Sequence, residues 1–167
     1  MTRVRKTKLA LIFFLIAVGL TNVAFIKKSQ TLGNLYFDSE DVRKGASYPK
    51  VLTYKGENIE QAKWQYLIDR VRKSSYMFVR NSETFGGAKA ATHLLWKFSR
   101  KGKGVKTAKE FIYRIASESS MSGSPYLVKV SDKETYPLRD VMMNELRRLE
   151  LYLEKDQLSP SEEKKGI

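Results

Sequence analysis

Residues 107–130 read TAKEFIYRIASESSMSGSPYLVKV, and this stretch decides the fold because it joins a helix start, a turn and a strand. Thr107 followed by Glu110 is typical of a helix N-terminus, since each side chain can accept a hydrogen bond from the other residue's backbone amide. We expect the helix to end near Ser119. The β-branched and aromatic residues at 126–130 then predict a strand. The helix's apolar stripe consists of Phe111, Ile112 and Ile115.

Three further helices are predicted at residues 59–73, 88–100 and 137–154, where apolar side chains recur at about 100° per residue. For the helix at 59–73 we expect Asn58 as the N-cap and Gln61 as its capping-box partner. For the helix at 137–154 we expect Pro137 in the first turn. The apolar stripes are Trp64, Leu67, Ile68 and Val71; Ala88, Ala91, Leu94, Leu95 and Phe98; and Leu138, Met142, Leu146, Leu149 and Leu153.

A second strand is predicted at residues 76–80 (YMFVR), and it is the natural antiparallel partner of residues 126–130. With 167 residues and 42% hydrophobic content, the chain has enough material for one core. The predicted fold class is therefore α+β: a small, mainly helical domain of four helices with a two-stranded antiparallel β piece, behind an N-terminal apolar helix.

The N-terminus has the pattern of an export signal. Residues 9–26 read LALIFFLIAVGLTNVAFI and come after four basic residues without an acid, so residues 1–26 are interpreted as a signal peptide or a signal anchor. Both remain open, because the apolar run is short for a membrane span and long for a cleaved signal. Either way we expect a periplasmic or otherwise extracytoplasmic domain, anchored in the inner membrane if the segment is retained.

The remaining chain is divided by composition. Residues 27–57 are interpreted as a linker with one short extended piece at 50–54, because glycines and a proline interrupt any long period. The globular domain is expected at 58–154. The polar residues 155–167 are expected to form a disordered tail.

Charge and residue types limit the partners. The 31 Lys and Arg residues exceed the 18 Asp and Glu residues, which favours an anionic envelope polymer, lipid headgroups or an envelope protein. The positive charge would suit binding to nucleic acid, but an exported domain would be separated from most nucleic acid. The absence of Cys excludes disulfides and thiolate catalysis, and a single His makes a transition-metal site improbable, so no cofactor is expected. The oligomeric state stays open.

Four segments together resemble the YfeK-like family, a bacterial domain of unknown function usually found behind a signal peptide. They are FVRN at 78–81, the Ala-x-His-Leu run at 91–94, TAKEFI at 107–112 and ASESSMSGSPYLVKV at 116–130. The resemblance covers residues 59–153 and implies export and domain limits, with no activity to carry over. The chain departs from the family pattern at Ser82, where Gly is expected, at Leu95, where many members carry Arg, and at 131–134, where an acidic-Gly turn is expected.

The serine-rich loop at 119–124 is the first candidate site. In one interpretation its hydroxyls bind the carbonyls at the helix end and Gly123 makes the turn. In the other, Ser119, Ser120, Ser122 and Gly123 hold an anionic or sugar-like ligand. Ser119 falls within the apolar stripe and should be buried. The other candidates for this ligand site are Tyr126, Arg80 and Asn81, the last two of which are expected mainly to order the turn after the strand.

His93 is the candidate for catalysis, although a lone His is usually structural. General acid–base chemistry needs a hydroxyl or carboxylate within reach, and the nearby candidates are Ser119, Ser122 and Glu83. The catalytic alternative is a hydrolase or transferase acting on cell-wall or lipid material through His93 and a serine of the 119–124 loop. We expect a non-catalytic binding or accessory module instead, because the sequence has no nucleophile elbow, paired-carboxylate motif or metal cluster.

A basic stretch, RKGKGVKTAK at 100–109, leads into the helix that starts at Thr107. Cations beside a helix N-terminus oppose its dipole, so an anion bound to the free amides there would be stabilised. The alternative is a solvated loop. The candidate anion-binding residues are Arg100, Lys101, Lys103, Lys106 and Lys109.

Overall fold

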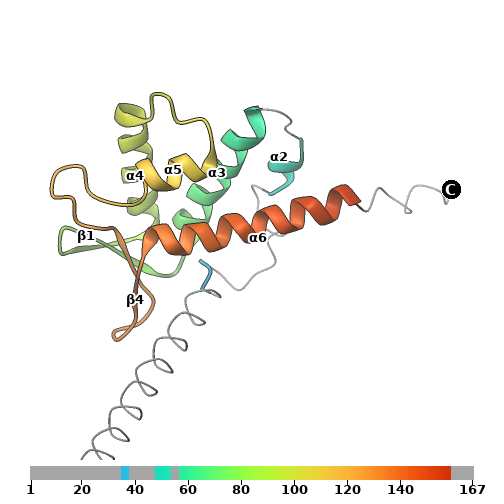
Figure 1. Ribbon diagram of the computed structural model, residues 1–167. Helices are drawn as coiled ribbons and strands as arrows, with labels where there is room; N and C mark the ends of the chain where they lie inside the picture. The colour runs from blue at the N-terminus through green and yellow to red at the C-terminus, as the bar shows by residue number, and fades with distance from the viewer. Residues whose placement is uncertain (1–34, 38–47, 54–56, 159–167) are drawn as a thin grey trace, which may run out of the picture. The chain divides into compact units, whose positions relative to one another are not determined.

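The computed structural model describes residues 35–37, 48–53 and 57–158 (Figure 1). The chain divides into two compact units, residues 1–35 and 36–167. The elements of the second unit are α2 (Tyr48–Thr53), α3 (Glu57–Lys73), β1 (Met77–Arg80), β2 (Glu83–Gly86), α4 (Gly87–Lys101), α5 (Ala108–Arg114), β3 (Leu127–Lys129), β4 (Thr135–Pro137) and α6 (Leu138–Leu158). The predicted apolar helix and export signal lie outside the described residues.

Helix α3 is at the centre of the helical core and contacts α2, α4, α5 and α6. Its predicted stripe is buried, as are the stripes of α5 and α6. The expected N-cap is wrong: α3 already begins at Glu57, so Asn58 lies inside the first turn. In α4, Ala91 and Leu94 of the predicted stripe are buried, Leu95 and Phe98 are half-buried, and Ala88 is exposed. Gly87 is buried in place of Ala88, and its backbone approaches the Val71 carbonyl so closely that a Cβ would lie 2.2 Å from the carbonyl oxygen.

The capping box that starts α5 is confirmed. Thr107 Oγ1 accepts from the Glu110 amide at 3.1 Å, and Glu110 Oε2 accepts from the Thr107 amide at 3.3 Å. The helix ends at Arg114, earlier than predicted. Side chains compete for the carbonyls at its end, because Ser117 Oγ donates to the Ile112 carbonyl at 2.9 Å.

The sheet is antiparallel with strand order β2-β1-β3-β4. The predicted pairing of β1 with β3 is confirmed, with Phe78 opposite Val128. The sheet has four strands and not two. Strand β2 was missed because the hairpin turn is Asn81-Ser82, both with positive φ, and this pair lacks the glycine that marks such turns. Pro137, expected to open the last helix, ends the short strand β4 instead.

The interpretation of residues 27–57 as a linker with an extended piece is wrong where the structure describes them. Residues 50–53 belong to α2, which packs on α3 and buries Tyr48 and Val51. Phe37 is also buried and its ring lies 6.1 Å from that of Phe78. These apolar side chains are taken into the core, which therefore begins before residue 58.

Helix α6 runs on to Leu158, so the predicted disordered tail is wrong for residues 155–158. Tyr48 Oη donates to Asp156 Oδ2 at 2.6 Å, a contact that ties this last turn to α2. The long helix crosses the front of the domain in Figure 1. None of the helices formed by the described residues is long and apolar enough to cross a bilayer.

A buried carboxylate links α6 to α3. Glu145 has no exposed surface; it accepts a hydrogen bond from Tyr66 Oη at 2.8 Å and lies 2.9 Å from Arg70 Nε. Arg148 Nη2 donates to both of its oxygens, at 2.9 and 3.0 Å. Two guanidinium groups and a phenol thus compensate the buried charge.

Candidate functional site

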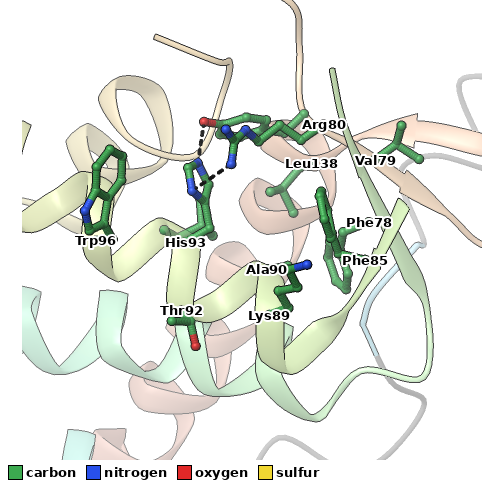
Figure 2. Close-up of a pocket in the computed structure, with 12 residues that line it drawn as sticks. Phe78, Val79, Arg80, Phe85, Lys89, Ala90, Thr92, His93, Trp96 and Leu138 are labelled. Carbon is green, nitrogen blue, oxygen red and sulfur yellow. Dashed lines mark hydrogen bonds between the residues drawn. The ribbon is translucent and has the colours of Figure 1, made fainter. Parts of the chain in front are cut away.

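The candidate site is centred on His93 of α4, next to Arg80 at the end of β1 (Figure 2). Tyr126, just before β3, contacts the other side of the imidazole. Arg80 Nη1 lies 3.0 Å from His93 Nδ1, and Tyr126 Oη lies 3.0 Å from His93 Nε2. The imidazole also stacks on Trp96, one turn along α4, at a centroid distance of 5.8 Å. Three elements that are distant in sequence therefore fix one imidazole.

The hydrogen bonds determine the protonation of His93. A guanidinium only donates, so Nδ1 must accept from Arg80 and carries no proton. The neutral ring then carries its proton on Nε2 and donates it to Tyr126 Oη, which leaves the phenol proton free to donate elsewhere. Burial, followed by the positive charges of Arg80 and Lys97, lowers the pKa of His93. His93 is therefore neutral at pH 7.

Two cavities meet at this group. The first, here called the apolar cavity, has a volume of about 310 Å³ and is shown in Figure 2. Its walls come from β1, β2, α4 and the start of α6. The lining residues are Phe78, Val79, Arg80, Phe85, Lys89, Ala90, Thr92, His93, Leu94, Trp96, Tyr126 and Leu138.

The second, here called the basic cavity, has a volume of about 220 Å³ and lies between α4 and the loop after α5. It shares Arg80, His93, Trp96 and Tyr126 with the apolar cavity. Neither lining includes an Asp or Glu side chain. The lining residues are Arg80, His93, Trp96, Lys97, Arg100, Lys101, Ser119, Ser120, Met121 and Tyr126.

Arg80 has no carboxylate partner among the residues that the structure describes. Glu83 faces it across the β1–β2 hairpin, yet the two side chains form no ion pair. Its one hydrogen bond within the described chain, to His93, occupies a single N–H of the five. Arg80 is partly buried and lines both cavities, so its positive charge is available to a ligand in either.

Lys97 supports the wall between the helix and the loop. It is only 4% exposed, and its Nζ donates to the Ile115 carbonyl at 2.8 Å and to the Glu118 carbonyl at 2.6 Å. Burial lowers its pKa. The ammonium lies 5.2 Å from the centre of the Tyr126 ring. Sequence reasoning missed this role, although a lysine one turn after His93 on the same face of α4 was visible in the sequence.

The serine loop closes on itself through its backbone. The Ser119 amide donates to the Ser124 carbonyl at 2.8 Å, and the Gly123 amide donates to the Ser119 carbonyl at 2.9 Å, with Gly123 at φ +68°. Ser119 is buried, as predicted, but the carbonyls at the end of α5 bind Ser117 and Lys97 and not the loop hydroxyls.

The predicted ligand residues separate into two groups. Those that line the cavities are Arg80, Ser119, Ser120 and Tyr126, together with His93. The others, Asn81, Ser122 and Gly123, line neither. Ser122 Oγ donates to Asn81 Oδ1 at 2.7 Å, a bond that ties the serine loop to the β1–β2 hairpin. Their contacts are therefore those of residues that hold the two loops together.

Three amides at the start of α5, where an anion site was predicted, are bonded to the protein's own carboxylates. The Lys106 and Thr107 amides donate to Glu110 Oε2, and the Ala108 amide donates to Glu60 Oε2 at 2.9 Å. The protein's own carboxylates therefore take the place expected for an external anion. Of the five predicted cations, Arg100 and Lys101 line the basic cavity; Lys103, Lys106 and Lys109 lie away from it.

The catalytic alternative needs a serine bonded to His93. Both nitrogens of His93 are instead occupied, by Arg80 and Tyr126. Ser119 and Ser120 share the basic cavity with His93, but no hydrogen bond joins either hydroxyl to the ring. Among the described residues no cluster of three or more His, Cys, Asp or Glu side chains is suited to a metal ion.

Comparison with known proteins finds a curated relative, the uncharacterized protein YfeK of Salmonella typhimurium (strain LT2). It is 36% identical over 55 residues, which cover 33% of this chain and 46% of the relative. The chain therefore matches just under half the length of that protein. No solved structure is significantly similar to the chain.

The matching family is a family of unknown function, DUF5329, whose pattern fits residues 58–150. This match covers more than half of the chain and includes α4, α5 and the loop between α5 and β3. The resemblance to the YfeK-like family is confirmed. The chain belongs to DUF5329, a family of unknown function.

Proposed function

We propose that this domain is a non-catalytic binding module for an anionic component of the cell envelope, and that the anion binds at Arg80 in the basic cavity. The observation that carries the proposal is the guanidinium of Arg80, held by His93 and unpaired with any carboxylate of the described chain. Charges that are withdrawn from water are usually paired, so a partly buried and unpaired charge in a cavity wall favours a ligand of opposite charge.

The surroundings of Arg80 also favour an anion. A guanidinium offers parallel N–H donors that match a carboxylate or phosphate, and partial burial strengthens the attraction relative to water. Arg100 and Lys101 add positive charge to the lining, and the Tyr126 hydroxyl has a proton to donate. Lys97 adds less, because its ammonium already binds two carbonyls.

The hydrolase or transferase alternative is weaker. A general base must accept a proton from its nucleophile, and the acceptor nitrogen of His93 is taken by Arg80. An arginine in that position also lowers the basicity of the imidazole. We therefore assign His93 the role of positioning Arg80.

We further propose that the module works outside the cytoplasm. The support is the sequence alone: four basic residues precede the apolar run at 9–26, an arrangement that keeps the N-terminus inside and exports the C-terminal part of the chain. Mass analysis of the mature protein from membrane and periplasmic fractions would show whether the segment is removed. Recovery of the protein only from the cytosol would contradict the proposal.

Binding to envelope material tests the anion site. The full chain is incubated with sedimented envelope fractions at salt concentrations from about 50 to 500 mM, and the retained fraction is measured. We expect retention that falls with salt and is reduced by Arg80→Gln. Arg72→Gln is the matched control, because it removes the same charge from an exposed site on α3 that lines neither cavity. Equal retention of the two variants would contradict the proposed site.

A further inference from the structure

We infer that the ligand of this site is a single-chain amphiphile: one acyl chain that fills the apolar cavity, joined to a carboxylate or phosphate that binds Arg80. The inference rests on the proposed anion site and adds the chemical class of the ligand. Its basis is the position of the apolar cavity, which adjoins the basic cavity at Arg80, His93, Trp96 and Tyr126.

The lining of the apolar cavity favours a hydrocarbon ligand over a bare anion. Beyond the shared residues its walls are mainly hydrocarbon, from Phe78, Phe85, Leu94 and Leu138 among others. The polar exceptions are Thr92 and Lys89, whose ammonium lies 4.5 Å from the centre of the Phe85 ring. Its volume of about 310 Å³ lies within the range of small-molecule pockets. A bare phosphate or a sugar polymer would leave these walls in contact with water, whereas an acyl chain gains about 0.8 kcal/mol for each CH₂ that it buries.

The polar end of the apolar cavity is where the headgroup of such a chain would lie. Arg80 lines both cavities, so a chain in one and an anion in the other would be joined next to its guanidinium. Neither cavity is lined by an acidic side chain, and Arg100 and Lys101 lie beyond the junction. The charge of the site therefore complements an anionic headgroup and not a cationic or zwitterionic one.

The rim of the basic cavity has the character of a lipid-contacting surface. Trp96 is 54% exposed and Met121 is 89% exposed, although both are large and apolar. Arg100 lies over the Trp96 ring, at 5.0 Å from its centre. Exposed aromatic and apolar side chains beside cations are typical of protein surfaces that approach anionic lipid. A free fatty acid and an acidic lysophospholipid share the required chemistry.

Trp96 provides the measurement, because it lines both cavities and the other tryptophan, Trp64, is buried among Phe98 and Phe111. The full chain, in phosphatidylcholine nanodiscs, is titrated with 11-bromoundecanoate, whose bromine quenches tryptophan on contact. A second titration uses a lysophosphatidylglycerol with a brominated chain. Comparison of the two titrations shows whether the site prefers a free fatty acid or an acidic lysophospholipid. We expect saturable quenching that is lost in Trp96→Phe.

Two variants separate the chain from the headgroup. Ala90→Phe fills the apolar cavity, and its matched control is Ala88→Phe, which adds the same ring at an exposed position of α4 outside both cavities. We expect Ala90→Phe and Arg80→Gln each to weaken binding at least about tenfold, and Ala88→Phe to leave it unchanged. The uncharged 11-bromoundecanol should bind about tenfold more weakly than the carboxylate. Ala90→Leu replaces Ala90→Phe if circular dichroism shows that the larger residue prevents folding.

The outcomes distinguish this inference from the proposed function. If glycerol phosphate competes with envelope retention in an Arg80-dependent way but Ala90→Phe leaves bromoundecanoate quenching unchanged, the acyl-chain inference is wrong and the anion site stands. If Arg80→Gln affects neither retention nor quenching, the anion site itself is wrong. Quenching by the alcohol as strong as by the carboxylate would also overturn the inference, because the cavity would then select the chain alone.

Discussion

Arg80 donates a hydrogen bond from Nη1 to Nδ1 of His93 at 3.0 Å, an arrangement that requires a neutral imidazole. A protonated ring has N–H groups on both sides and would face the guanidinium as a second positive charge. The position of Arg80 in the cavity wall therefore depends on the protonation of His93. Because the pKa of His93 is lowered, the site should keep this arrangement at neutral pH and lose it only at a pH below the ordinary pKa of histidine.

The first prediction concerns stability against pH. The pKa of His93 is lowered in the folded protein from an ordinary value of 6.5, so the unfolded chain binds the proton more readily. The free energy of unfolding should therefore be unaffected well above pH 6.5, decrease as the pH falls through that value, and level off below the folded pKa. Urea unfolding from pH 8 to pH 4.5 measures this change.

His93→Gln is the control for that series. Glutamine keeps an acceptor for Arg80 and a donor for Tyr126 but does not titrate. The difference in stability between wild type and variant should narrow or reverse as the pH falls from 7.5 to 5. Parallel curves for the two proteins would show that another group causes the pH dependence.

Lys97 yields the second prediction. Lys97→Met keeps most of the buried stem but leaves the carbonyls of Ile115 and Glu118 without their donor. The Ile115 carbonyl is buried, and a buried carbonyl that loses its partner costs about 1–3 kcal/mol, so we expect a loss of at least about 1 kcal/mol. Lys101→Met, at an exposed position of the same helix, should change stability by less than about 0.5 kcal/mol. Equal effects in denaturant unfolding would contradict a structural role for Lys97.

The third prediction concerns the link between α3 and α6. Glu145→Gln removes the charge that compensates Arg70 and Arg148 in the interior, and breaking a buried ion pair in this way costs about 3–5 kcal/mol. Tyr66→Phe removes a single hydrogen bond to the same carboxylate and should cost about 1.5–3 kcal/mol. Thermal unfolding of both variants shows which substitution lowers the stability more. A larger effect for Tyr66→Phe would show that packing, and not charge, dominates there.

Local signals in the sequence were sufficient for much of the fold. The capping box at Thr107 and Glu110 and the apolar stripes of α3, α5 and α6 depend on neighbours within one or two helical turns, and the structure has them. Helix α2 carries little periodic signal in its six residues. Its helical form depends on burial of Tyr48 and Val51 against other elements, which local pattern does not reveal.

The sequence identified the residues of the candidate site but not their contacts with one another. His93, Arg80 and Tyr126 were all named from the sequence, yet their contacts join residues 13 and 33 positions apart and depend on the pairing of β1 with β3. The basic stretch at 100–109 was predicted to bind an anion at the start of α5. Glu60, 48 positions before Ala108, accepts a hydrogen bond from the Ala108 amide and so occupies one of the groups that were expected to bind an external anion.

The fourth prediction concerns Ser82, which has φ +66° in the β1–β2 turn, a position where the resemblance to the YfeK-like family led us to expect glycine. A side chain in the left-handed region costs roughly 1–2 kcal/mol, whereas glycine loses some of that advantage through its greater freedom in the unfolded chain. Ser82→Gly should therefore raise the free energy of unfolding by about 0.5–1 kcal/mol. Asn81→Gly is the control: asparagine tolerates φ +50°, and its Oδ1 accepts from Ser122 Oγ, so this variant should be less stable than wild type. Chemical denaturation of the two variants compares them directly, and a destabilised Ser82→Gly protein would show that the serine contributes an interaction worth more than the strain of its backbone.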